Sequence, residues 1–379
     1  MTDYRRSIQS LLETDLVPNK VNLLLGARRV GKTYLVQQIL RQTSYRTLVL
    51  EGEDADAQQL LAPRTIAHYQ RLLADIDLLV IDEAQAVPAI GQVLKLIVDH
   101  VKPIRVLVTG SSALELVNQS GEPLTGRAFT HYLFPLAQAE LAPYENALQT
   151  RQRLEDRMLY GSYPDVVQAE SPNARERYLR DLVNAYLLKD LMAYDGVRNA
   201  GKIRDLLRLV AFQVGKEVSM DELARQLQLS RNTVEKYLDL LTNVFVIRRV
   251  GGFSRNLRKE VTKSARWYFT DTGIRNALIG DFRPLPLRTD VGELWANYMV
   301  AERIKALQAQ RRPVDFYFWR TYDQQEIDWL EAENGQLRAY EFKWNETAKA
   351  RAPKAFADAY PDATFDVVHS GNYLDFILP

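Results

Sequence analysis

Short apolar runs alternate with amphipathic stretches over the first third of the chain. Five runs have the length and composition of strands, and they lie at Val21–Leu25, Arg46–Glu51, Asp77–Ile81, Ile104–Thr109 and Phe129–Phe134. Between them, apolar residues recur at helical spacing over Thr33–Arg41, Asp56–Leu73 and Ile90–Val101. Strands that alternate with helices are typical of a parallel sheet covered by helices on both faces. The pattern therefore predicts an α/β domain over residues 1–137.

The pattern changes twice in the middle of the chain. Residues 138–200 are helical throughout and are predicted to form a helical linker or lid. In residues 201–283, Ser219 opens a capping box before a helix at Met220–Leu227, and Ser230 caps a second helix. Two short helices joined in this way have helix-turn-helix spacing. Two strands, Val244–Val250 and Ala265–Thr270, flank a basic loop. Residues 201–283 are therefore predicted to be a winged helix.

Pro284 and Pro286 mark a last boundary, and residues 284–379 are predicted to form a small α/β domain. The expected order is helix, three strands, helix and strand. These elements are expected at Val291–Gln308, Val314–Arg320, Gln325–Ala332, Gln336–Trp344, Ala348–Tyr360 and Thr364–His369.

Composition narrows the classes of protein. A chain of 379 residues with 46% hydrophobic and 26% charged residues is typical of a globular protein of several domains. Forty-nine basic and 48 acidic residues give no global field, so any contact with nucleic acid or membrane requires a local patch. The absence of cysteine excludes disulfides and thiolate metal sites. No apolar run approaches membrane-spanning length and no signal-peptide core follows Met1, so a cytoplasmic protein without membrane contact is expected.

The most specific motif is the octet Gly26–Thr33, which fits G-x-x-x-x-G-K-[ST] and lies between a predicted strand and a predicted helix. This arrangement aims backbone N–H groups and a helix N-terminus at phosphate. Lys32 is predicted to reach the β- and γ-phosphates, and Thr33 to offer its hydroxyl to Mg²⁺. The predicted nucleotide contacts are Gly26, Ala27, Arg28, Arg29, Val30, Gly31, Lys32, Thr33, Tyr34 and Ser111.

Hydrolysis requires further groups, and the apolar strand that ends at Asp82-Glu83 supplies two carboxylates. Asp82 is predicted to hold Mg²⁺, and Glu83 to orient and deprotonate the attacking water. Ser111, which follows another strand, is a candidate contact for the γ-phosphate or the water. Arg127 is a candidate arginine finger that acts in its own subunit or in a neighbour's. These residues predict ATP and Mg²⁺ as ligands.

With these motifs, the chain resembles the predicted AAA+ ATPases of bacteria and archaea. The resemblance covers nearly the whole chain. It rests on Gly26–Thr33, Leu78–Glu83, Val108–Ser112, Leu124–Arg127, Phe134–Leu136, Gly161–Pro164 and Leu188–Leu191. The resemblance implies a P-loop ATPase with a winged helix and a C-terminal domain of unknown function. Ala27 stands where many members have proline, at a position that contributes backbone only.

A hairpin is predicted in the last part of the chain, because Asn334-Gly335 is a strong signal for a two-residue turn. This turn places Asp328 opposite Glu341 and Glu326 opposite Lys343. Period two puts these four side chains on one face. The other face is predicted to carry Ile327, Trp329, Tyr340, Phe342 and Trp344. Since facing like charges are destabilising, something must compensate for Asp328 opposite Glu341, and a divalent metal would do so.

An aspartate on one strand and Glu-x-Lys on the next resembles the metal-binding signature of PD-(D/E)XK nucleases. The resemblance implies that Asp328 and Glu341 bind Mg²⁺ and that Lys343 assists the attacking water. It also implies an additional acid on the preceding helix, Glu302, with Glu293 as its substitute. Ala296 stands where related chains often have another glutamate. The alternative is an ordinary solvated face, with a Glu326–Lys343 ion pair, on an inactive nuclease-like fold.

From Arg248 to Arg266, along the two strands of the predicted winged helix and the loop between them, there are seven basic residues and one acid, Glu260. The basic residues are Arg248, Arg249, Arg255, Arg258, Lys259, Lys263 and Arg266. On a wing, such residues would contact phosphates, and Arg231, Asn232 and Lys236 could face a DNA groove from the second helix. Winged helices also bind proteins, and Glu235 and Asp239 weaken the electrostatic case for DNA.

The sequence thus predicts an ATP-hydrolysing AAA+-type protein that couples nucleotide state to DNA binding, with metal-dependent DNA cleavage as an extension. The alternative is a nucleotide-gated DNA- or protein-binding switch with an inactive nuclease-like domain. A homo-oligomer is compatible with both.

Overall fold

The computed structural model describes residues 2–111, 124–187, 200–254, 265–321 and 323–378. The chain forms two compact units. The N-terminal unit comprises residues 3–134 with 243–245, and the C-terminal unit comprises residues 1–2, 135–242 and 246–379.

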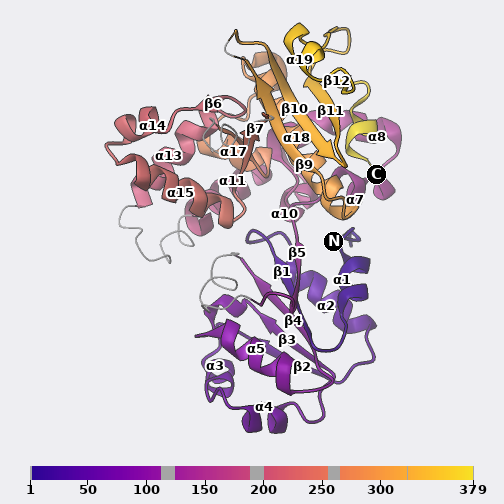
Figure 1. The fold of residues 1–379 in the computed structure, drawn as a ribbon, viewed down its shortest axis with the longest axis vertical. Coiled ribbons are helices and arrows are strands. Elements are labelled where there is room, and N and C mark those ends of the chain that lie inside the picture. The colour runs from indigo at the N-terminus through magenta and orange to yellow at the C-terminus, as the bar shows by residue number, and fades with distance from the viewer. Residues whose placement is uncertain (1, 112–123, 188–199, 255–264, 322, 379) are drawn as a thin grey trace. The chain divides into compact units, whose positions relative to one another are not determined.

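A five-stranded sheet forms the centre of the N-terminal unit (Figure 1). Its strands are β1 (Lys20–Leu25), β2 (Thr47–Glu51), β3 (Leu78–Asp82), β4 (Arg105–Gly110) and β5 (Ala128–Tyr132). All neighbours pair in parallel, in the order β2-β3-β4-β1-β5. The predicted parallel α/β sheet is therefore confirmed.

Among the described residues of this unit, five helices accompany the sheet: α1 (Gln9–Asp15), α2 (Lys32–Gln42), α3 (Ala55–Leu61), α4 (Ile66–Leu72) and α5 (Ile90–His100). The single helix predicted over residues 56–73 is in fact two. Pro63 lacks the N–H that a continuing helix requires, and Arg64 has a left-handed φ of 49°. Residues Ala84–Ala86 form a short 3₁₀ turn, η1, which follows β3 after Glu83.

The C-terminal unit begins with short helices: α7 (Gln138–Leu141), α8 (Ala147–Gln152), α9 (Leu154–Tyr160), α10 (Pro164–Gln168) and α11 (Pro172–Asp181). A π-helical turn, η3 (Leu182–Leu187), follows α11. The 3₁₀ turns η2 (Ala142–Tyr144) and η4 (Leu285–Leu287) lie after α7 and before α18. The next elements are α13 (Ala200–Phe212), β6 (Glu217–Val218), α14 (Met220–Leu227), α15 (Arg231–Asn243), β7 (Ile247–Gly252), β8 (Ala265–Phe269) and α17 (Thr272–Ile279). The last part contains α18 (Val291–Ala309), β9 (Asp315–Arg320), β10 (Glu326–Glu333), β11 (Gln336–Phe342), α19 (Lys354–Ala359), β12 (Thr364–Val368) and α20 (Tyr373–Ile377).

One seven-stranded sheet runs through this unit in the order β12-β11-β10-β9-β7-β8-β6. The two halves of the sheet meet where β7 pairs in parallel with β9, at Gly251–Tyr317 and Gly252–Phe318. The strands of the predicted winged helix and those of the predicted nuclease-like domain are therefore continuous. The separate boundaries predicted at 200/201 and 283/284 stay predictions.

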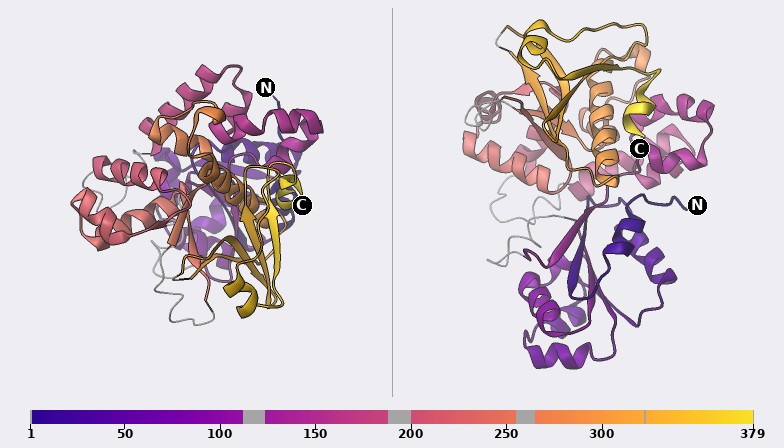
Figure 2. Two further views of the ribbon diagram at one scale, coloured as in Figure 1. Left: turned by 90° about the horizontal axis from the view of Figure 1, so that it is seen from above. Right: turned by 45° about the vertical axis from the view of Figure 1, so that its right-hand side comes forward.

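Helices cover both faces of the β9–β12 half of this sheet. The long helix α18 packs against β8 and β11, and Figure 2 shows it running along the strands. On the opposite face, Phe356 of α19 packs in a core cluster with Trp319, Ile327, Leu330 and Ala339. Ile327 and Leu330 reach the same cluster because a bulge lies between them in the pairing of β10 with β9. The strict alternation predicted for β10 is therefore wrong at this point.

The hairpin between β10 and β11 has the predicted register. Trp329 pairs with Tyr340, and Glu333 pairs with Gln336. The turn residues Asn334 and Gly335 have φ values of 51° and 81°, as a two-residue hairpin of this handedness requires. The register predicted from Asn-Gly is thus confirmed over residues 329–340.

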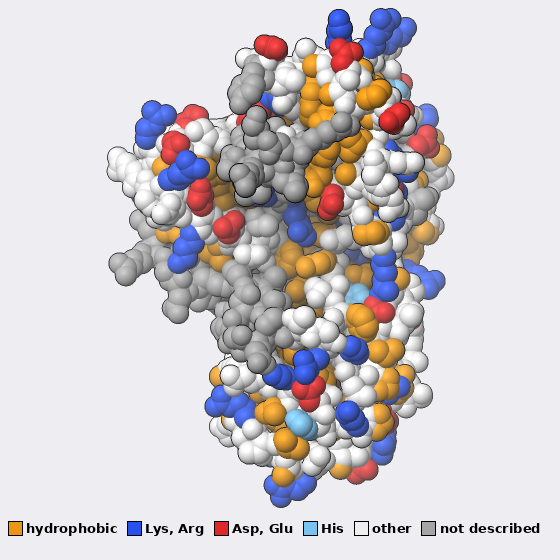
Figure 3. All heavy atoms as spheres, in the orientation of Figure 1, with side chains coloured by type: hydrophobic (Ala, Val, Ile, Leu, Met, Phe, Trp, Pro, Cys, Tyr) orange, Lys and Arg blue, Asp and Glu red, His pale blue; other side chains and the backbone are white. Residues whose placement is uncertain are grey.

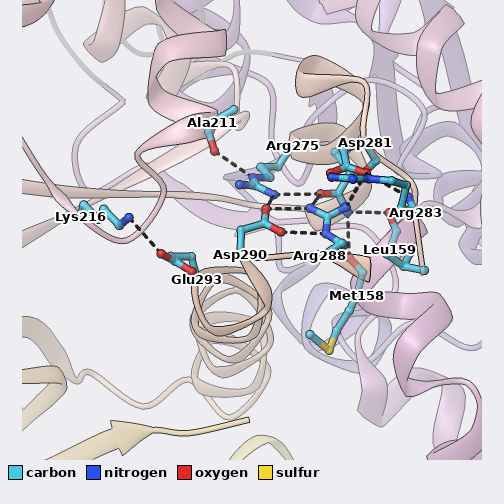
Figure 4. Close-up of polar contacts among 11 residues, drawn as sticks. Met158, Leu159, Ala211, Lys216, Arg275, Asp281, Arg283, Arg288, Asp290 and Glu293 are labelled. Atoms are coloured by element: carbon cyan, nitrogen blue, oxygen red, sulfur yellow. Dashed lines mark hydrogen bonds and ion pairs between the residues drawn. The ribbon is translucent and has the colours of Figure 1, made fainter. Parts of the chain in front are cut away.

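A buried polar network joins the helices beside the sheet (Figure 4). Arg275 and Arg288 share the carboxylate of Asp290, which precedes α18. Arg275 also donates to the carbonyl of Ala211 in α13 at 2.9 Å. Asn276 donates to the carbonyls of Met158 and Leu159 in α9, so α9, α13, α17 and the start of α18 are held together.

Candidate active site

The octet Gly26–Thr33 forms the loop between β1 and α2, as the sequence predicts. Arg29 and Gly31 have left-handed φ values of 64° and 98°, which curl the loop ahead of the helix. Gly26 lies so close to the backbone that a Cβ there would be 2.2 Å from the carbonyl oxygen of Leu133. Lys32 is buried, and its Nζ donates to the carbonyls of Gly26 at 3.1 Å and Ala27 at 3.2 Å. The lysine ammonium therefore lies across the loop that would surround a phosphate.

The predicted metal ligands lie side by side at the carboxyl end of the sheet. The Thr33 hydroxyl donates to Oδ2 of Asp82 at 2.6 Å. Thr109, at the end of β4, donates to the other carboxylate oxygen of Asp82. A hydroxyl and a carboxylate oxygen are hard donors of the kind that Mg²⁺ takes together with nucleotide phosphates. The donor set at Thr33 and Asp82 therefore fits the ion that the sequence predicts.

Glu83 follows β3 and is held in a strained backbone conformation. Its φ of 47° lies in the left-handed region, which is uncommon for a residue with a side chain. Gly52 makes this possible, because a Cβ at Gly52 would lie 2.4 Å from the carbonyl oxygen of Glu83. The Glu83 carboxylate lies 3.7 Å from Lys32 Nζ. The structure thus brings Lys32, Thr33, Asp82 and Glu83 into one site.

Ser111 reaches this site through an intermediary that sequence reasoning missed. Gln85 Nε2 donates to Glu83 Oε2 at 2.5 Å and to Ser111 Oγ at 3.2 Å. Thr109 also accepts from the backbone N–H of Glu83 at 2.9 Å. The polar residues at the end of β4 therefore fix Asp82, which ends β3, and Glu83, which follows it. A polar strand end beside the Asp-Glu strand was the available signal for Thr109, whereas Gln85 offered none.

Arg6 is a second residue that the sequence did not reveal. It is 6% exposed, and its guanidinium donates to the carbonyl of Val30 in the loop at 2.8 Å. It also donates to the carbonyl of Phe134 at 2.6 Å. Nothing near Arg6 in the sequence has a motif that would have identified it.

Arg127 lies at the amino end of the parallel strands, whereas the phosphate loop lies at their carboxyl end. It directly precedes β5, and Ala128 pairs with Val21 at the start of β1, whereas the loop follows the end of β1. A strand of six residues spans about 20 Å, well beyond the reach of an arginine side chain. Arg127 pairs instead with Asp99 of α5 at 2.8 Å. The prediction that it contacts phosphate in its own subunit is therefore wrong, and the neighbour's site is the alternative that stays a prediction.

The C-terminal unit contains a pocket of about 590 Å³ beside the β10–β11 hairpin. Its charged lining residues balance, with four bases and four acids: Lys216, Arg266, Arg320, Lys343, Glu217, Glu293, Glu326 and Asp328. Ala296 and Trp344 also line it. Three of the four residues predicted on the charged hairpin face therefore share one pocket, and the fourth, Glu341, pairs with Lys343 of that pocket.

Arg266 supplies positive charge beside Asp328, where the sequence predicts a metal. This arginine is 4% exposed, and it bonds Glu326 at 2.6 Å and Asp328 at 3.3 Å. Asp328 also accepts from the backbone N–H of Phe342 at 3.0 Å. Lys343 pairs with Glu341 at 2.7 Å, so the predicted Glu326–Lys343 pair is replaced by two others.

The protonation of these acids follows from their surroundings. Burial raises the pKa of Asp328, against the opposing effects of the Phe342 N–H and Arg266. Burial and the Asp328 charge raise the pKa of Glu341. Although burial opposes it, the hydrogen bond to Glu341 raises the pKa of Lys343. Asp328 and Glu341 do repel each other, as predicted, but cationic side chains compensate.

The acids that line this pocket already have cationic partners. Among the described residues, no group of three or more His, Cys, Asp or Glu side chains could hold an ion. Glu302 is not one of the pocket residues and is 2% exposed. Its two oxygens accept from the backbone N–H of Gln138 and from Lys305 Nζ, both at 2.7 Å. Its assignment as an additional metal ligand does not fit, whereas the substitute, Glu293, lies in the pocket and pairs with Lys216 at 3.0 Å (Figure 4).

Several residues of the predicted nucleic-acid surface are engaged elsewhere. Arg266 is buried in the pocket, and Arg231 pairs with Asp221 and Glu235. Asn232 and Lys236 of α15 are exposed. Figure 3 shows acidic and basic side chains intermixed over α14 and α15. Arg255, Arg258, Lys259 and Lys263 lie outside the described residues, as do Ser112 and the segment 188–191.

The chain is similar in sequence, over nearly its whole length, to uncharacterized proteins of bacteria and an archaeon. An uncharacterized protein of Mycobacterium tuberculosis is 30% identical over 377 residues, which cover 97% of this chain and 80% of the relative. The same values hold for an uncharacterized protein of Mycobacterium bovis. The chain belongs to their family. A more distant relative from Methanocaldococcus jannaschii is 21% identical over 378 residues, with 94% of this chain and 82% of the relative covered.

Three segments of this chain match known domain families. Residues 18–142 match the AAA domain family, and residues 151–284 and 291–374 match two domains of unknown function. The N-terminal unit is therefore an AAA-like P-loop domain. A Pyrococcus horikoshii signal transduction ATPase with a tetratricopeptide repeat sensor aligns with 81% of this chain and 47% of its own. Its identity of 12% and TM-score of 0.32 are too low to support an argument. In the part of the chain that the structure describes, no helix is both long and apolar enough to span a bilayer.

Proposed function

We propose that this protein hydrolyses ATP and that nucleotide state controls a C-terminal unit that binds a partner without cleaving it. The observation that carries the ATPase proposal is the convergence of Lys32, Thr33, Asp82 and Glu83 at the end of β1 and β3. The match of residues 18–142 to the AAA domain family supports the same activity.

In the proposed reaction, backbone N–H groups of the loop and Lys32 bind the β- and γ-phosphates. Thr33 and Asp82 would hold Mg²⁺, which when bound neutralises phosphate charge. Glu83 orients a water and accepts its proton as the water oxygen bonds to the γ-phosphorus. The bond from the γ-phosphorus to the bridging oxygen breaks, and ADP and inorganic phosphate leave. Gln85 holds the Glu83 carboxylate, and Thr109 holds the Glu83 backbone N–H.

Thr33→Ala tests this site. Because it removes the hydroxyl that accompanies Asp82, we expect turnover of ATP to fall at least about tenfold at physiological Mg²⁺. Thr43, at the other end of α2, provides the control. Thr43→Ala should leave turnover within about twofold. Full turnover by Thr33→Ala would refute the proposed role.

The pocket beside the hairpin supports a binding role over nuclease activity. Arg266 and Lys343 already compensate the acids that a nuclease would give to metal. The proposal therefore follows the second interpretation of the sequence, in which the nuclease-like fold is inactive. Incubation of the protein with supercoiled DNA and Mg²⁺ or Mn²⁺ should give no cleavage. Cleavage that Lys343→Ala abolishes would reverse this conclusion.

DNA is the partner that the sequence predicts, through a winged helix. The order α13-β6-α14-α15-β7-β8, with β8 antiparallel to both β6 and β7, supports that fold. Asn232 and Lys236 are exposed polar residues of α15 that would contact DNA. Binding of a labelled duplex should weaken at least about threefold in Lys236→Ala and fall as salt rises. Undetectable binding at low salt would favour a protein partner instead.

A further inference from the structure

Residues 133–138 connect the two units, and we call them the connector. Its first residues, Leu133 and Phe134, lie beside the phosphate loop. Arg6 is buried, and one of its nitrogens bonds the carbonyl of Val30 in the loop. Another bonds the carbonyl of Phe134, the last residue of the N-terminal unit before Pro135. A single side chain therefore joins the loop to the point at which the chain leaves the unit.

Backbone contacts strengthen this link. The N–H of Leu133 donates to the carbonyl of Leu25 at 2.7 Å, directly before the loop. The carbonyl oxygen of Leu133 occupies the space into which a Cβ at Gly26 would project, at 2.2 Å. Such close packing leaves no slack, so a movement of the loop must be accompanied by a movement of Leu133 and Phe134.

The far end of the connector is held by α18 within the C-terminal unit. Lys305 Nζ donates to the carbonyl of Leu136 at 3.2 Å and to Glu302 at 2.7 Å. Glu302 in turn accepts from the N–H of Gln138 at 2.7 Å. Both side chains are less than 10% exposed, with values of 7% for Lys305 and 2% for Glu302. The same helix carries Glu293 into the pocket.

We propose that Arg6 positions the phosphate loop and, with residues 133–138, transmits nucleotide occupancy from the loop to α18. The proposal rests on the proposed ATPase function. A bound γ-phosphate draws the loop N–H groups toward itself and shifts Val30. Because Val30 and Phe134 share one guanidinium, this shift alters the position of Phe134. Pro135 joins Phe134 to Leu136, and its ring fixes one of the backbone dihedral angles between them.

This role explains why charged groups are buried at both ends. Buried ions are costly, and apolar side chains of similar volume often stabilise a protein as well or better. Arg6, Glu302 and Lys305 each bond backbone of the connector or its anchor, so they fix the position of the chain. Glu302, which the sequence suggested as a metal ligand, is thus a positioning residue.

Hydrogen exchange of the full chain, followed by mass spectrometry, tests the proposal. The parent protein carries Glu83→Gln so that ATP is bound without turnover. Saturating ATP and Mg²⁺ should slow exchange in residues 26–33, and also at least about twofold in residues 133–141 and 291–309. Protection of residues 26–33 alone would overturn the proposed transmission but leave the nucleotide site intact. No protection anywhere would overturn both proposals.

Two variants in this parent separate transmission from folding. Arg6→Gln should retain ATP protection of residues 26–33 at saturation and lose the responses of residues 133–141 and 291–309. Lys305→Met should keep the response of residues 26–33 and lose that of residues 291–309. Arg5→Gln, the same change at an exposed neighbour, is the matched control and should behave as the parent. A full response of residues 291–309 in Arg6→Gln or in Lys305→Met would overturn the proposal. If Arg6→Gln does not fold, the Lys305→Met result decides.

Discussion

The Thr33 hydroxyl donates a hydrogen bond of 2.6 Å to the Asp82 carboxylate, across 49 residues of sequence. The parallel sheet makes this contact, because β1 and β3 both pair with β4 and end at the same edge. Residues that follow two such strands converge there. This relationship brings Thr33 of the loop together with Asp82 and with the adjacent acid, Glu83.

Arg127 should be dispensable for turnover within one subunit. It pairs with Asp99 at the amino end of the parallel strands, away from the loop at their carboxyl end. Arg127→Ala should therefore leave the kcat of dilute, monomeric protein within about twofold, and cost under about 1 kcal/mol of stability because the pair is partly exposed. ATPase assays over a range of protein concentrations check this. A tenfold loss in kcat for the monomer would contradict the position assigned to Arg127.

Arg266 should be essential to the stability of the C-terminal unit. Arg266→Met removes the buried cation that bonds the partly buried Asp328 and the exposed Glu326, and leaves both carboxylates without it. We expect a loss of about 3 kcal/mol in the free energy of unfolding, measured in urea. Because burial raises the pKa of Asp328, Asp328→Asn in the Arg266→Met background should recover part of the loss. Unchanged stability in Arg266→Met would show that the acids do not depend on it.

Asp281 should contribute a pH-dependent part of the stability. Its hydrogen bonds with Arg283 lower the pKa of Asp281 to about 2 from its ordinary value of 3.8. A depressed pKa means that the folded state favours the charged form. The contribution is therefore complete above the ordinary pKa and is lost as pH falls from about 4 to about 2.

Asp281→Asn isolates this contribution. The variant should be less stable than the wild type by about 1 kcal/mol at pH 6, a value that allows for solvent screening of Arg283. The difference should shrink toward zero near pH 2, which denaturant unfolding at several pH values would measure. A difference that stays constant over this range would contradict the assignment.

Gly161 is predicted to be intolerant of any side chain. A Cβ there would lie 2.0 Å from Oδ1 of Asp271, the buried carboxylate that accepts from the Ser162 N–H at 2.7 Å. Gly161→Ala should cost at least about 3 kcal/mol in unfolding free energy. Gly280 has a similar φ of 72°, but nothing lies within 4 Å of its added Cβ. Gly280→Ala should therefore cost only about 1 kcal/mol. Equal losses would mean that backbone strain alone explains Gly161.

Local patterns were enough to predict most strands and to pick out residues that converge at the carboxyl end of the N-terminal sheet. The strand-loop-helix context identified Gly26–Thr33, and an apolar strand ending in two acids identified Asp82 and Glu83. Asn334-Gly335 set the hairpin register because turn geometry is local. The limits of these predictions appear where a second segment intervenes. The bulge in β10 depends on its pairing with β9, which no pattern within β10 shows.

Long-range partners were the part that could not be predicted. Arg266 compensates Asp328 across 62 residues, and Arg6 contacts Phe134 across 128. In the sequence, Arg266 is one of several basic residues near a loop, and Arg6 is part of a polar N-terminus. Their roles depend on burial and on the pairing of distant strands, so a reading of residue types alone assigned Arg266 to DNA and missed Arg6.

Glu83→Gln tests the central claim most directly. The substitution keeps the size of the side chain and removes its ability to accept a proton from water. ATP binding, measured by calorimetry with Mg²⁺, should stay within about threefold of wild type, while ATP turnover falls at least about 100-fold. Glu53→Gln, an exposed acid near the same edge of the sheet, is the matched control and should leave both unchanged. Wild-type turnover in Glu83→Gln would contradict the account.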